Sequence, residues 1–187
     1  SVTPKLGTVK NVRVRSQKSK ITVSWQQVAA AERYAVYRSN GRTMVQVGET
    51  DGLSFVDQGL DVGAPYTYYV RAVNSSCGYL GDYSEPVAFL LLPQTVTKVS
   101  GVSVNTQKAV LKWRAVTKAK YYIVYYAKEK GGEYKKLATV RGGEKYTHKN
   151  LEKGTVYYYK VTAVQKNRLK MKVESLGSTP VRVKIVK

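Results

Sequence analysis

Apolar and polar residues alternate with a period of two along much of the chain. Within residues 66–73, one side of the segment is apolar and consists of Tyr66, Tyr68, Val70 and Ala72. Such alternation is typical of a β-strand with one buried face. Similar short segments recur, separated by turn signals such as Asn40-Gly41. The pattern predicts an all-β protein with the strand spacing of a β-sandwich, and no segment has the period of a stable amphipathic helix.

The sequence also repeats itself. Trp25 and Trp113 lie 88 residues apart, and each ends an alternating segment. Other matching segments are residues 34–37 with 122–125, residues 60–66 with 151–157, and residues 84–87 with 178–181. The offset between the copies changes only between strand-like segments, where loops tolerate insertions. The chain is therefore predicted to contain two copies of one fold, in residues 1–93 and 94–187.

These motifs resemble the fibronectin type III family. In both copies Tyr-x-Val follows the tryptophan nine residues later, and Leu-x-x-Gly-x-x-Tyr-x-x-x-Val-x-Ala comes after it. The resemblance covers nearly the whole chain and implies two immunoglobulin-like β-sandwiches of seven strands each, with sheets A-B-E and C-C′-F-G. It places strand C at residues 33–39 and 121–127, and strand F at residues 66–74 and 157–165. The variant is similar to tandem modules of secreted or cell-surface proteins of Gram-positive bacteria.

The same resemblance implies structural roles for the aromatic residues. Trp25 and Trp113 would fill the centres of the two cores. Tyr66 and Tyr157 would be tyrosine corners, with hydroxyl groups that bond back to the upstream backbone. The expected core residues are Trp25, Tyr34, Val36, Tyr66 and Val70 in the first copy, and Trp113, Tyr122, Val124, Tyr157 and Val161 in the second.

Positive charge is concentrated in the second copy. Of the net charge of +20, residues 1–93 contribute +3 and residues 94–187 contribute +17, mostly as lysine. Such asymmetry indicates a polyanionic neighbour in many proteins. Lysines on strand edges also prevent edge-to-edge pairing of sheets, so composition leaves both explanations open.

The sequence offers little catalytic chemistry. His148 is the single histidine and Cys77 the single cysteine. They cannot form a zinc site of several His or Cys ligands, and their place in different copies disfavours a Cys–His nucleophile pair. His148 occupies the position of Asp57 in the first copy and is interpreted as a turn residue. We therefore expect no enzyme activity, metal or cofactor, and the short apolar runs predict no membrane insertion.

A surface remains as the candidate functional feature. If alternate residues of strand C in the second copy point into the core, their neighbours face outward. The candidate ligand face consists of Tyr121, Tyr125, Tyr158 and Lys160 in the second copy and Tyr37, Tyr69 and Arg71 in the first. Strand G is expected to add alternate residues of 168–172. Aromatic rings among cations suit sugars or anionic polymers, although Tyr and Lys are also ordinary partners on a solvated sheet face.

Two functions are compatible with these features. The first is a non-catalytic structural or interaction segment, a spacer or adhesion-type module pair, in a larger bacterial surface or secreted protein. The alternative is a binding module for carbohydrate or an anionic polymer, for example as an accessory to a carbohydrate-active enzyme. The expected partner is a protein or glycan, or an anionic cell-wall polymer bound by the second copy. Nucleic acid is disfavoured because no recognised motif accompanies the charge. A monomer is expected, outside the cell or on its surface, with the targeting segment outside this sequence.

Overall fold

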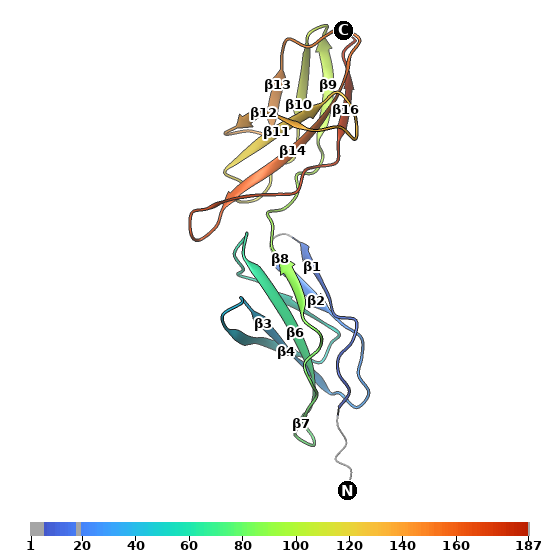
Figure 1. Ribbon diagram of the computed structural model, residues 1–187, viewed down its shortest axis with the longest axis vertical. Coiled ribbons are helices and arrows are strands. Elements are labelled where there is room, and N and C mark those ends of the chain that lie inside the picture. Colours follow the sequence, from blue (N-terminus) through green and yellow to red (C-terminus); the bar gives the residue numbers. More distant parts are fainter. Residues whose placement is uncertain (1–5, 18–19, 187) are drawn as a thin grey trace. The chain divides into compact units, whose positions relative to one another are not determined.

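The chain forms two compact units with β-structure only. The structure, a computed structural model, describes residues 6–17 and 20–186. The first unit ends at Leu91 and the second begins at Leu92, two residues before the boundary placed from the sequence. Figure 1 shows strands throughout both units, and none of the described residues is helical. Accordingly, this part of the chain contains no helix that is long and apolar enough to cross a membrane.

Each unit contains two antiparallel sheets. In the first unit one sheet has the order β1-β2-β5, and the other has the order β4-β3-β6 with β7 and β8 both paired to β6. Its strands are β1 (Arg13–Gln17), β2 (Lys20–Ser24), β3 (Arg33–Ser39), β4 (Met44–Thr50), β5 (Ser54–Asp57), β6 (Pro65–Asn74), β7 (Tyr79–Leu80) and β8 (Val87–Leu90). The two sheets contain the strands predicted for them, A-B-E and C, C′, F and G, and in the second sheet β4 (C′) lies at the edge while β3 (C) pairs with β6 (F).

The second unit repeats that topology. One sheet has the order β13-β10-β9, and the other has the order β12-β11-β14 with β15 and β16 paired to β14. The strands are β9 (Ser100–Asn105), β10 (Lys108–Lys112), β11 (Tyr121–Ala127), β12 (Lys135–Val140), β13 (Lys145–His148), β14 (Val156–Lys166), β15 (Lys172–Glu174) and β16 (Val181–Lys184). The prediction for strand C matches β3 and β11, and that for strand F matches β6 and β14 to within one residue at each end.

The last strand of each sandwich is interrupted, so eight segments stand where seven strands were predicted. In both units a serine lies in the interruption. The Oγ of Ser84 accepts a hydrogen bond from the backbone N–H of Val70 at 3.0 Å. Ser178 does the same for Val161 at 3.1 Å. A side chain thus replaces a ladder hydrogen bond, which lets the chain leave the regular strand and return to it.

The core of each unit is organised around a tryptophan. Trp25 packs against Tyr34, and Trp113 packs against Tyr122, with ring centroids 5.4 Å apart in both pairs. Each of these tyrosine hydroxyls accepts a hydrogen bond at 2.9 Å from the backbone N–H six residues upstream. All ten residues expected in the cores are buried, with at most 8% of the side chain exposed. The two copies therefore share one packing plan.

The tyrosine corners also have the expected contacts. The hydroxyl groups of Tyr66 and Tyr157 accept hydrogen bonds from the backbone N–H five residues upstream, at 2.9 and 3.3 Å. The intervening loop turns at Gly63 and Gly154, whose φ angles of 77° and 83° lie in the left-handed region that glycine adopts without strain. These bonds hold the loop that enters β6 or β14.

The two units differ at the end of strand E. In the first unit the buried Asp57 ends β5, and its Oδ2 accepts hydrogen bonds from Arg38 at 2.6 Å and from the hydroxyl of Tyr68 at 2.8 Å. Burial and the contact with this carboxylate raise the pKa of Tyr68. The buried negative charge of Asp57 is therefore compensated by Arg38 and by the hydroxyl of Tyr68.

The interpretation of His148 as a turn residue is wrong. His148 is the last residue of β13 and is half-buried, with Nδ1 3.0 Å from the hydroxyl oxygen of Tyr159. Its ring packs against the rings of Tyr126 and Tyr157 at centroid distances of 5.3 and 6.0 Å. Burial lowers the pKa of His148 because removal from water disfavours the charged imidazolium.

We expect Tyr66→Phe to destabilise the first unit by about 1 kcal/mol, because the loop N–H loses its acceptor. Tyr157→Phe should cost less in the second unit, since its bond is longer. Urea unfolding of the intact chain, fitted with one transition per unit, measures both changes. Tyr69→Phe is the matched control on the outer side of the same strand and should have little effect, because phenylalanine keeps the ring that packs against Tyr83. Equal losses in all three variants would contradict the assignment.

The stability of the second unit should depend on the protonation of His148. Its folded-state pKa is lowered, so below the unfolded value of about 6.5 the unfolded state binds more protons than the folded state. The free energy of unfolding is therefore expected to be highest above the unfolded-state pKa. It should fall as the pH drops from the unfolded-state pKa towards the lower folded-state pKa. Urea midpoints between pH 4.5 and 8 test this. The His148→Gln variant should lose this component of the pH profile, and an unchanged profile would refute the role of His148.

Candidate functional site

The predicted ligand face of the second unit lies on the outer side of β11 and β14. Tyr122 and Val124 belong to the core cluster, so alternate residues of β11 face away from it. Tyr121 and Tyr125 are half-buried on this outer side. Ile123 lies between them and is outside the core cluster, yet it is also buried. The middle of this face is therefore buried, and its accessible surface lies towards the two ends.

Several predicted face residues are engaged by their own neighbours. The hydroxyl of Tyr125 donates to Glu174 Oε1 at 2.8 Å, and Thr162 Oγ1 donates to the same oxygen at 2.6 Å. Burial, with a further contribution from the bond to Glu174, raises the pKa of Tyr125 to about 12. Lys160 Nζ lies 4.0 Å from the ring centroid of Tyr134, in a cation–π contact. The side chains of Tyr125 and Lys160 are therefore already engaged in contacts within the second unit.

Tyr121 is the predicted face residue that lies in a pocket. The pocket has a volume of about 600 Å³ and is lined by Lys120, Tyr121, Arg141, Lys166, Asn167, Lys170 and Lys172. We call it the cationic pocket, because five of these side chains carry positive charge and none is a carboxylate. Of its other residues, Lys170 and Lys172 fall within the range 168–172 that the sequence predicted to contribute to this face, and the remaining lining residues were not singled out. Tyr158, half-buried on β14, and Lys160 are not among them.

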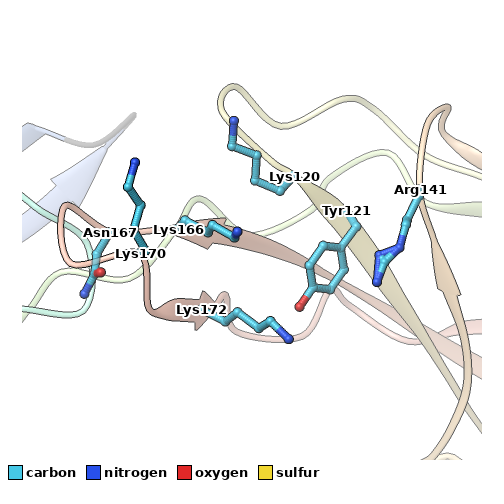
Figure 2. A pocket seen from close by; sticks show the side chains of 7 residues that line it. All are labelled: Lys120, Tyr121, Arg141, Lys166, Asn167, Lys170 and Lys172. Atoms are coloured by element: carbon cyan, nitrogen blue, oxygen red, sulfur yellow. The ribbon is translucent and has the colours of Figure 1, made fainter.

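The cations approach the ring of Tyr121 from two sides. Arg141, just after β12, has its Cζ 5.2 Å from the ring centroid. Figure 2 shows Lys166 and Lys172 directed towards Tyr121 from the other side. The same view shows the ends of Lys120 and Lys170 pointing away from the ring. We call these two the rim lysines, and Arg141, Lys166 and Lys172 the inner cations.

A tight turn positions the rim lysine of the β14–β15 hairpin. Asn167 is buried, and its Oδ1 accepts a hydrogen bond from the backbone N–H of Met171 at 2.9 Å. Lys170 has a φ of 63°, the left-handed region that is uncommon for residues with a Cβ. The prediction of a strand over residues 168–172 is therefore wrong for 168–171, because β15 begins only at Lys172. The turn-forming Asn167 is the sequence signal that could have indicated this.

Like charges face each other in the pocket. Lys166 on β14 is directly opposite Lys172 on β15. Such a pair destabilises a sheet when no anion lies between the two charges. Lys112 and Lys145 form a second lysine pair on the other sheet, so the pairing itself is not special to the pocket. The pocket differs in that five cations converge, and within residues 6–17 and 20–186 none of them forms an ion pair.

The first unit presents a different face. The predicted residues Tyr37, Tyr69 and Arg71 do lie together, joined by Tyr83, which the sequence analysis missed. Tyr83 packs edge-to-face against Tyr37 and Tyr69 at centroid distances of 5.1 and 6.1 Å. The guanidinium of Arg71 covers the ring of Tyr83 at 4.5 Å, and its Nε donates to the carbonyl of Gly81 at 2.8 Å. Tyr83 was missed because it lies in the interruption of the last strand, where no periodicity marks it.

Metal-binding groups were also sought in the structure. The described ranges contain no cluster of three or more His, Cys, Asp or Glu side chains that could hold a metal ion. The free thiol of Cys77 is exposed. The cationic pocket is thus the most developed candidate site, and its chemistry suits anions.

No protein-family model matches the sequence. A curated relative is an amylopullulanase from Thermoanaerobacter thermohydrosulfuricus, which is 35% identical over 96 residues. That alignment covers 49% of this chain and 6% of the amylopullulanase, so the chain spans only a small part of the relative.

Solved structures match over more of the chain. A segment of two fibronectin type III domains from chicken tenascin is 19% identical and has a TM-score of 0.51; the match covers 94% of this chain and 98% of that segment. An Fn3-like protein from Clostridium thermocellum is 32% identical over 49% of this chain and 92% of that protein, with a TM-score of 0.44. The tenascin segment shares the order of two sandwiches along one chain. By its fold, this chain is therefore a tandem pair of fibronectin type III domains.

Proposed function

We propose that the chain is a non-catalytic interaction segment of a larger extracellular bacterial protein, and that its second domain binds anionic ligands in the cationic pocket. The observation that carries this proposal is the convergence of five cations on one pocket with no carboxylate in its lining. Charge-assisted hydrogen bonds to phosphate, sulfate or carboxylate oxygens are the strongest contacts that such side chains make. An anion between Lys166 and Lys172 would also relieve their mutual repulsion.

The larger protein is inferred from the relatives. The matched part of the amylopullulanase is 6% of its length, which fits a domain embedded in a much longer protein. The shared fold with tenascin domains supports a place among extracellular proteins, secreted or on the cell surface. In that setting, anionic polymers of the cell wall or matrix are available partners, and adhesion is the corresponding role.

A second candidate function is an accessory role beside a carbohydrate-active catalytic domain, with a neutral glycan as ligand. The amylopullulanase match favours it, and the tyrosine cluster of the first domain offers an aromatic surface. The two functions differ in their response to salt. Contacts between charges weaken as ionic strength rises, whereas sugar–aromatic contacts change little.

Binding to dextran sulfate should depend strongly on salt. If all five cations contact the polymer, at about 0.7 released counterions per contact as for single-stranded polyanions, affinity should fall roughly 100-fold between 50 and 200 mM salt. Isothermal titration of the intact chain measures this, with neutral dextran and pullulan as comparison ligands. Tight binding to pullulan that is insensitive to salt would support the accessory role instead.

Matched triple variants locate the site. Arg141→Gln, Lys166→Gln and Lys172→Gln together remove the inner cations, while Lys108→Gln, Lys112→Gln and Lys145→Gln remove three exposed charges from the other sheet. Both variants lose the same charge, so an effect of net charge alone would weaken dextran sulfate binding equally. We expect the pocket variant to lose at least about tenfold more affinity than its control. Equal losses would refute the pocket as the binding site.

Removing the lysine pair should stabilise the second domain while weakening binding. Lys172→Thr takes away the charge that faces Lys166, so the free energy of unfolding should rise by about 0.5 kcal/mol at low salt. Lys112→Thr relieves the facing pair with Lys145 on the other sheet and should give a similar gain. Urea unfolding at 20 mM and 500 mM salt measures both, and the gains should shrink at the higher salt. Lys172→Thr should also reduce dextran sulfate binding more than Lys112→Thr does, and equal reductions in the two variants would contradict the proposal.

A further inference from the structure

We infer that the ligand of the cationic pocket is an anionic glycan chain that is bound through several successive charged groups, not a single small anion. This inference rests on the proposed function, which requires only that the pocket binds anions. It adds the length of the ligand and its chemical class. The argument comes from the width of the pocket, from the directions of its cations and from the environment of Tyr121.

The cations are spread over four strands. The sheet order is β12-β11-β14-β15, with Arg141 just after β12, Lys120 just before β11, Lys166 at the end of β14 and Lys172 at the start of β15. Neighbouring strands lie about 4.8 Å apart, so the backbone positions of these residues extend over roughly 15 Å across the sheet. A phosphate or sulfate monoester offers three terminal oxygens at one point. Arg141, Lys166 and Lys172 extend towards the middle of this span whereas the rim lysines point away from it, so one such group cannot contact all five cations.

The directions of the side chains divide the pocket into a centre and two flanks. Figure 2 shows the ring of Tyr121 between Arg141 on one side and Lys166 and Lys172 on the other. One anionic group of the ligand would bind beside this ring, between Lys166 and Lys172. The rim lysines point away from this centre. Both are exposed, and the left-handed backbone at Lys170 is held by the turn that Asn167 stabilises. Charged groups on either side of the central one would reach Lys120 and Lys170.

The environment of Tyr121 favours a glycan over a nucleic acid. Proteins that hold single-stranded nucleic acids stack the bases on open aromatic faces. The ring of Tyr121 is instead packed against the guanidinium of Arg141. Its hydroxyl group extends in Figure 2 towards the side of Lys172. Recognition would then come from cations that contact the charged groups and from a phenol that contacts sugar hydroxyls, which suits a charged glycan.

Ligands of graded length test the inference. The intact chain is titrated calorimetrically at 50 mM salt with glucose 6-sulfate and with heparin-derived di-, tetra- and octasaccharides of defined size. Affinity per molecule should rise at least tenfold from the monosaccharide to the octasaccharide, because each added contact becomes intramolecular. A glycerol phosphate polymer of matched length, measured in parallel, distinguishes a phosphodiester chain from a sulfated one. Inorganic triphosphate and oligo-dT are the small-anion and nucleic-acid comparisons.

Two double variants separate the centre from the rim. Lys120→Gln with Lys170→Gln should reduce octasaccharide affinity by about tenfold while leaving the weak binding of glucose 6-sulfate unchanged, because these lysines contact only the flanking groups. Lys166→Gln with Lys172→Gln should weaken binding of both ligands. Lys108→Gln with Lys112→Gln is the matched charge control and should weaken neither binding reaction beyond a small general effect. Circular dichroism and urea midpoints verify that every variant is folded.

The outcomes distinguish this inference from the proposed function. If no anion binds, both are wrong. If glucose 6-sulfate and the octasaccharide bind equally, or the rim variant has no effect, the pocket is an anion site but the polymer inference is overturned. Triphosphate or oligo-dT binding more tightly than either polymer would assign the pocket to a small polyanion or to nucleic acid and would likewise overturn it.

Discussion

Each domain is organised around the packing of a buried tryptophan on a tyrosine whose hydroxyl group binds the backbone. Trp25 with Tyr34 and Trp113 with Tyr122 have the same centroid separation of 5.4 Å. The tyrosine is the second residue of strand C in both domains. Since its ring must point inward to reach the tryptophan, alternation along the strand turns the residues on either side of it to the other face of the sheet. The core contact therefore decides that Tyr121 faces solvent, where the cationic pocket forms around it.

The two domains share a core and differ in their surfaces and in one buried position. At the end of strand E, the first domain buries Asp57 against Arg38 and Tyr68, and the second half-buries His148 among tyrosines. A polar group is satisfied at this position in both domains. In the first it is a carboxylate paired with a positive charge, and in the second it is a neutral imidazole ring. The fold tolerates this exchange because only the packing volume and the hydrogen bonds must be met. A shared fold therefore carries no information on ligands, and the argument for binding rests on the surface of the second domain.

The β14–β15 hairpin combines several locally unfavourable features. Lys170 adopts a left-handed backbone conformation, and Lys166 lies directly opposite Lys172. Each feature costs stability, and sequences generally avoid such conflicts except at functional or strained sites. The buried Asn167 holds the turn despite them. Under the proposed function, a hairpin that keeps its charges close together in this way would bind an anionic ligand with little rearrangement of its lysines.

The sequence by itself determined the all-β class and the repeat, because the alternation of apolar and polar residues is a local property of the chain. Its motifs, through their resemblance to the fibronectin type III family, implied the two sheets, the limits of strands C and F, and the core residues. Only the tertiary structure decided three further features. His148 was wrongly assigned to a turn, because the tyrosines that surround it belong to β11 and β14 and their proximity is not visible in the sequence. The last strands are interrupted because Ser84 and Ser178 bond to a neighbouring strand. The cationic pocket draws Lys120, Arg141, Lys166 and Lys172 together from four strands, and charge composition cannot reveal such convergence, which depends on the order of strands in the sheet.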